Sequence, residues 1–87
     1  MAYDDLGELQ KSIDAYMASL EIKREYGDTR SLANTLGNLG IKYKNLGMLN
    51  KAEGYLREQL EISETIDDHR GMSNALGNLG NVFRLKG

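Results

Sequence analysis

The chain has 87 residues, of which 40% are hydrophobic and 28% charged, with a formal net charge of -2 and no cysteine. This length suits one small domain, the charge gives no basic bias that would indicate nucleic acid, and the lack of cysteine excludes disulfides and thiolate metal sites. No apolar run reaches the roughly 20 residues of a membrane span, and no secretory signal opens the sequence, so we expect a cytoplasmic (intracellular) protein with no membrane contact.

Proline is absent, whereas glycine occurs ten times. A proline-free sequence rich in Leu, Glu, Lys and Ala favours helices, in which each interior glycine costs about 1 kcal/mol relative to alanine. The glycines are therefore expected at helix ends or where helices pack closely.

The sequence repeats itself at a distance of 40 residues. In that alignment 17 of the 47 pairs are identical, and the block "LGNLG" at 36–40 recurs at 76–80. Self-similarity at such a period indicates a repeat architecture. We expect a single repeat domain over 1–87 with truncated half-repeats at both ends.

In chain order, residues 1–6 are predicted to end a preceding helix, and the complete helices are predicted near 8–26, 29–46, 50–66 and 69–86. Within the second, apolar residues recur along one face, at positions 36, 39, 43 and 46. Short connections make neighbouring helices antiparallel.

The predicted helix boundaries carry capping residues. Asp28 and Asp68 are expected N-caps, and Gly47 is an expected C-terminal cap. Asn50 with Glu53 three residues later is typical of a capping box.

The stretch "LGNLGIKYKNLGMLNKAEGYLREQLEI", residues 36–62, resembles a tetratricopeptide repeat. The resemblance implies an all-α fold, with antiparallel helix-turn-helix repeats stacked as a short right-handed α-solenoid. The period of about 40, rather than the usual 34, is similar to that of kinesin light chains and Leu-Gly-Asn-type spindle-orientation scaffolds. Gly40 and Gly80 take the family's small position, where a neighbouring helix packs closely.

In this family the first helix of each repeat lines a concave groove that receives an extended peptide. Polar residues at four-residue steps form a stripe on each of these helices, and Gly37 and Gly77 are expected on the groove floor. The candidate groove residues are Arg30, Asn34, Asn38, Ile41, Lys42, Asn45, Arg70, Asn74, Asn78, Asn81 and Arg84.

Asparagine amides can pair with both the N–H and the C=O groups of an extended backbone, and arginines bind carboxylates. The stripe therefore favours a protein–protein interaction module that binds an extended, acidic peptide. The alternative for these residues is plain solvation of an exposed helix face.

A second hypothesis is a self-associating repeat unit, either a fragment or an engineered piece. Its terminal helices carry apolar residues that invite stacking or dimerisation between copies. These residues are Leu9, Ile13, Tyr16, Leu20 and Ile22 in the first helix and Leu76, Leu79, Val82, Phe83 and Leu85 in the last.

Nothing in the sequence assembles a nucleophile–base pair, a metal cluster or a phosphate loop. His69 is the single histidine and has no partners for a metal site, and the adjacent Asp67 and Asp68 fit helix capping. We therefore predict a protein that is not an enzyme and needs no cofactor or metal.

Overall fold

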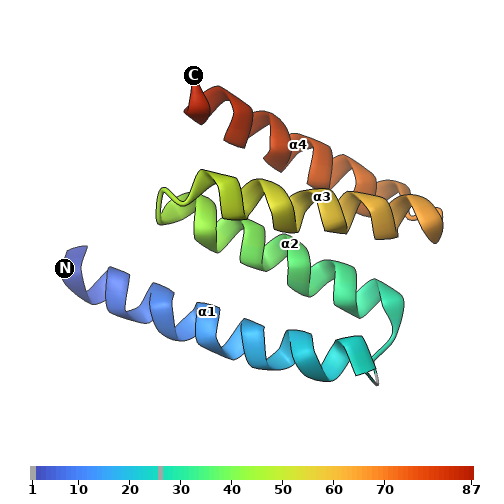
Figure 1. Cartoon of the computed structure of the whole chain (residues 1–87), viewed down its shortest axis with the longest axis horizontal. Coiled ribbons are helices and arrows are strands. Elements are labelled where there is room, and N and C mark those ends of the chain that lie inside the picture. Colours follow the sequence, from blue (N-terminus) through green and yellow to red (C-terminus); the bar gives the residue numbers. More distant parts are fainter. Residues whose placement is uncertain (1, 26) are drawn as a thin grey trace.

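A computed structural model describes residues 2–25 and 27–87, without the side chains of residues 2–6 and 9. The described helices are α1 (Ala2–Glu25), α2 (Thr29–Asn45), α3 (Leu49–Thr65) and α4 (His69–Lys86), with no strand among these residues. Each helix runs antiparallel to the one before it and packs against it (Figure 1). The prediction of an all-α fold is confirmed.

The second helix lies at the centre of the contacts. It packs against α1 and α3 and also touches α4, which runs in the same direction (Figure 1). Side chains of α1 and α3 also contact each other beside α2. Arg24 on α1 donates two hydrogen bonds to Glu58 on α3 (2.8 and 3.1 Å). The hydroxyl of Tyr55 on α3 donates to Met17 Sδ on α1 at 3.4 Å. The apolar sides of α2 are therefore covered by α1 and α3.

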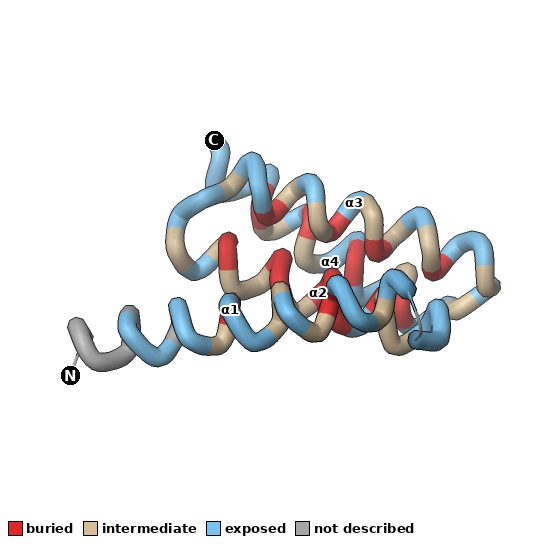
Figure 2. The backbone as a smooth tube through the Cα atoms, turned by 60° about the horizontal axis from the view of Figure 1, so that its bottom comes forward, coloured by how far each residue is buried: buried red, intermediate tan, exposed pale blue. Residues whose placement is uncertain are grey.

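Buried side chains from all four helices form one hydrophobic core, which lies on the facing sides of the helices (Figure 2). Burial of this apolar area is the main favourable term in folding. The core residues are Ile13, Leu20, Leu36, Leu39, Tyr43, Ala52, Leu56, Leu79 and Val82.

Local hydrogen bonds define the helix ends. The Asp28 carboxylate accepts from the backbone N–H three residues later at 2.9 Å, and Asp68 does the same at 3.2 Å, which confirms both predicted N-caps. Gly47 has φ +79°, and the Met48 N–H donates to the Tyr43 carbonyl at 2.9 Å. This is a Schellman ending, which places glycine in the left-handed region.

Two sequence predictions about helix ends are wrong. Asn50 is not a cap, because α3 already begins at Leu49 and its N-cap position is Met48; the turn after Gly47 fixes where α3 starts. Residues 2–6 do not belong to a separate helix, because α1 continues through Gly7. One interior glycine costs only about 1 kcal/mol, and helix-forming residues follow it.

The close approach of α2 and α3 depends on Gly40. A Cβ atom at this position would lie 2.6 Å from Cγ and Cδ2 of Leu56, which is fully buried. The prediction of a close-packing glycine therefore holds at Gly40. It fails at Gly80, where a Cβ would have no atom within 4 Å, because no helix among the described residues covers that face of α4.

The two glycines make a matched pair for mutation. We expect Gly40→Ala to destabilise the fold by about 1–2 kcal/mol, since overpacking against Leu56 outweighs the gain in helix propensity. Gly80→Ala should instead stabilise it by about 0.5–1 kcal/mol. Urea unfolding monitored by circular dichroism checks both, and equal effects of the two substitutions would contradict the packing argument.

A small charged network joins the start of α3 to the end of α4. Glu53 accepts from Lys86 Nζ at 2.6 Å and from Arg57 Nε at 2.7 Å, and the Arg57 guanidinium lies over the Phe83 ring, 5.8 Å from its centroid. These two hydrogen bonds hold the pKa of Glu53 below its ordinary value of 4.5, and the bond from Lys86 has the larger effect. Folding therefore favours the ionised carboxylate.

The lowered pKa gives stability a defined pH dependence. The contribution of Glu53 is complete above the ordinary carboxyl value and is lost as the pH falls through the lowered folded-state pKa. We expect Glu53→Gln to lower the thermal midpoint at pH 7, and the difference from the wild type to shrink as the pH falls below the ordinary carboxyl value. The control is Glu61→Gln, an exposed position on the same helix, and an equal loss there at pH 7 would contradict the assignment.

Candidate functional site

The predicted polar stripe lies on the side of α2 and α4 that faces away from the core. On α2 the buried Leu39 and Tyr43 lie opposite the asparagines, and on α4 the buried residues lie on the side next to Asn78. The helices α2 and α4 touch each other. Arg30, Asn34, Asn45, Arg70, Asn74 and Arg84 are exposed, and Asn38, Ile41, Lys42, Asn78 and Asn81 are half-buried. We call these eleven residues the α2–α4 surface.

Four asparagines form the middle of this surface. Asn34 and Asn38 stand one turn apart on α2, and Asn74 and Asn78 repeat that spacing on α4. Among the described residues, none of these four side-chain amides hydrogen-bonds to another protein group. Each amide therefore offers two donors and an acceptor to a ligand or to water.

Charge is distributed unevenly between the helices. α2 and α4 each contain three lysines or arginines and no carboxylate, whereas α3 has four carboxylates against two cations. The surface built by α2 and α4 is therefore cationic in a chain of net charge -2. This segregation could have been read from the sequence, and four of the eleven surface residues, Arg30, Lys42, Arg70 and Arg84, are cations.

Some of the basic groups already have partners within the chain. Arg30 Nε lies 4.0 Å from Asp68 Oδ2, Arg84 donates a hydrogen bond to Asn81 Oδ1, and Lys86 is paired with Glu53. The ion pair of Arg30 joins the start of α2 to the start of α4. It therefore links the two N-terminal ends of the surface, although an exposed pair of this kind contributes little stability.

Of the two glycines predicted on the groove floor, Gly37 is not there, and the place of Gly77 stays a prediction. Gly37 is buried, and a Cβ on it would lie 2.6–2.8 Å from the side-chain amide of Gln59. Gly37 lies about 100° around the helix axis from Leu36, and this places Gly37 on the side of α2 that faces α3. Gly77 repeats this position on α4, where it is exposed with no atom within 4 Å of a Cβ.

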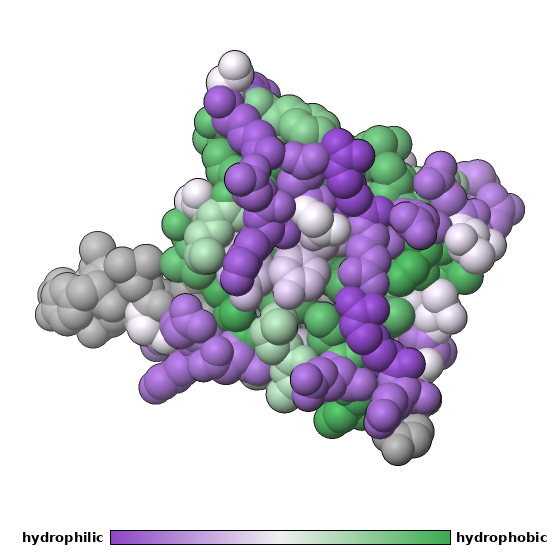
Figure 3. Space-filling view, viewed as in Figure 1, coloured by the Kyte–Doolittle hydropathy of each residue, from purple (hydrophilic) through white to green (hydrophobic). Residues whose placement is uncertain are grey.

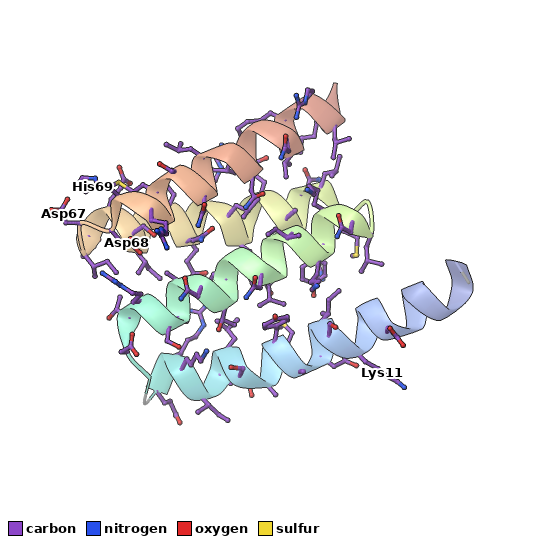
Figure 4. The ribbon with its side chains drawn as sticks, turned by 180° about the vertical axis from the view of Figure 1, so that it is seen from behind. Lys11, Asp67, Asp68 and His69 are labelled. Carbon is purple, nitrogen blue, oxygen red and sulfur yellow. The ribbon has the colours of Figure 1, made fainter. Side chains whose placement is uncertain are left out.

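Asp67, Asp68 and His69 lie together at the turn between α3 and α4, far from Lys11 on α1 (Figure 4). Asp68 caps α4, and His69 Nε2 lies 3.4 Å from the Asp67 carboxylate with both side chains exposed. Among the described residues, no group of three histidine, cysteine or acidic side chains could hold a metal ion.

The family can now be assigned. The tetratricopeptide repeat family model matches residues 1–65. The chain belongs to the tetratricopeptide repeat family. No curated protein matches the sequence, and no described helix is long and apolar enough to cross a membrane.

The tetratricopeptide repeat assignment agrees with the packing described above. A repeat of this family is a pair of antiparallel helices, and such repeats stack so that each contacts its neighbours. Here α2 and α3 form such a pair, α1 stands where the second helix of the preceding pair would stand, and α4 repeats α2 at a distance of 40 residues.

Proposed function

We propose that the α2–α4 surface binds an extended acidic segment of a protein partner. Tetratricopeptide repeats generally mediate protein–protein interaction, so binding of a protein is the expected role of this chain. The observation that supports an acidic segment is the combination of unpaired asparagine amides and excess cations on two adjacent helices that contain no carboxylate.

The chemistry of the surface suits an extended backbone. Amides one turn apart on each helix can alternate donation to backbone carbonyls with acceptance from backbone N–H groups, whatever the peptide side chains are. The guanidinium groups of Arg30, Arg70 and Arg84 at the edges can bind carboxylates with charge-assisted hydrogen bonds. Affinity should then come from the backbone contacts and preference from the acidic side chains.

The proposal is tested with a short fluorescein-labelled peptide in which Asp and Glu alternate with Thr. We expect saturable binding that weakens with added salt. The double substitution Asn38→Ala and Asn78→Ala should weaken binding at least about fivefold, because two hydrogen bonds are lost. Fluorescence anisotropy measures the affinity.

Two controls separate binding from unfolding and from nonspecific attraction. Asn50→Ala changes an exposed asparagine on α3 and should leave the affinity unchanged. A peptide with Lys in place of Asp and Glu should not bind. If the double variant binds like the wild type, the α2–α4 surface is not the binding site and its asparagines are only solvated.

A further inference from the structure

A hollow lies along the side of α3 that faces α1. Its volume is about 280 Å³, and it is lined by Lys51, Gly54, Tyr55 and Glu58. Among the described residues, α1 and α3 have no close backbone contact, so only side chains bridge the space between them. On this face, weakly polar and hydrophobic side chains lie between hydrophilic ones (Figure 3). We call this site the α3 hollow.

The contacts of the lining residues separate the α3 hollow from the α2–α4 surface. Tyr55 and Glu58 form hydrogen bonds with side chains of α1. Glu53, on the other side of α3, instead accepts a hydrogen bond from Lys86 of α4. Because α3 has α1 on one side and α4 on the other, the hollow lies between elements that the structure describes.

Gly54 has no packing role among the described residues. It lies inside α3, where glycine lowers helix stability relative to alanine. A Cβ on Gly54 would meet no described atom within 4 Å, whereas Gly37 and Gly40 are covered by side chains of α3. The absence of a side chain at Gly54 leaves the backbone of α3 open to the hollow, where another group can approach it closely.

The aromatic and acidic groups of the hollow are held in place by internal contacts. The Tyr55 ring stacks on Tyr43, with ring centroids 5.5 Å apart and an interplanar angle of 6°, and its hydroxyl donates to Met17 Sδ. The Glu58 carboxylate accepts two hydrogen bonds from Arg24. A site whose walls are fixed before binding loses less conformational entropy when a ligand enters it.

Charge distinguishes the two ends of the hollow. Lys51 and Glu58 stand about 10 Å apart along the helix axis. The charge of Glu58 is met by Arg24, whereas no described carboxylate forms an ion pair with Lys51. The Lys51 ammonium lies over the Tyr43 ring, 5.3 Å from its centroid, and exposed Glu61 adds negative charge beyond Glu58. An anionic group is therefore favoured at the Lys51 end.

The size and the lining of the hollow suit one aromatic side chain. Sites for drug-sized molecules have volumes of about 300–1,000 Å³, and the α3 hollow, with about 280 Å³, is smaller than these. Aromatic rings pack favourably against an aromatic wall such as Tyr55. Aromatic side chains that fill such pockets supply much of the binding energy of protein–protein interfaces.

We propose that the α3 hollow binds an aromatic side chain of a protein partner, with the carboxylate of an adjacent partner residue at Lys51. The partner residues on either side of the aromatic one cover the open side of the hollow. This is a second binding site, separate from the α2–α4 surface, and it does not depend on the peptide binding proposed there.

A tryptophan peptide tests this proposal, because the chain itself contains no tryptophan. The probe is the acetylated pentapeptide Ser-Asp-Trp-Ser-Ser, and its indole fluorescence is followed as protein is added. We expect saturable binding with a shift of the emission to shorter wavelength. Gly54→Gln should weaken binding at least about tenfold, because its side chain occupies the hollow. Lys51→Gln should weaken it about twofold to fivefold and reduce its salt dependence.

Matched variants serve as controls. Gly80→Gln adds the same side chain at another exposed helical glycine with open space around it. Lys11→Gln removes the charge of an exposed lysine on α1 that is the repeat counterpart of Lys51. Both should bind the probe like the wild type, as should the double variant Asn38→Ala and Asn78→Ala. Circular dichroism verifies that each variant is folded.

Four results would overturn the proposal. A probe that shows no saturable binding at the highest attainable protein concentration has no site. Binding that is unchanged in Gly54→Gln takes place elsewhere, and binding that is lost only in the double asparagine variant takes place on the α2–α4 surface. Free indole-3-acetate should bind more weakly than the pentapeptide, and equal affinity would identify a small aromatic acid as the ligand. The acidic peptide used for the α2–α4 surface contains no aromatic residue, so the two proposals can fail separately.

Discussion

The contact between α3 and the glycine face of α2 is the constraint on which the rest of the structure depends. Leu56 rests on Gly40 and Gln59 rests on Gly37 at distances that leave no room for a Cβ. Side chains at such a contact set how closely two helix axes approach. The contact of α2 with α3 is more extensive than its contacts with α1 and α4.

The exposed side of α2 is a consequence of that packing. Once α1 and α3 cover its apolar faces, the remaining side carries the asparagines and the cations. α4 repeats the arrangement beside it, and the ion pair of Arg30 with Asp68 links the two helix starts. Acidic residues gather on α1 and α3 instead. Packing and charge segregation thus produce a cationic, amide-rich surface without a dedicated loop or cofactor.

Local chemistry made several features predictable. The N-caps at Asp28 and Asp68 and the ending at Gly47 depend only on residues within a few positions of each other, and the structure confirms them. The start of α3 was misjudged at Asn50 because the turn closed by Gly47 decides it. The prediction that residues 1–6 end a preceding helix was wrong because α1 continues through Gly7, and the neighbouring sequence does not distinguish an interior glycine from a terminal one.

The sequence by itself determined the 40-residue repeat, the all-α fold and which residues share one face of a helix, because helical periodicity and the repeat are properties of the chain alone. Only the tertiary structure decided which neighbour covers each face. Gly40 and Gly80 have the same local sequence, yet one lies under Leu56 and the other faces open space. The physical reason is that close packing is a property of two helices, and periodicity describes only one of them.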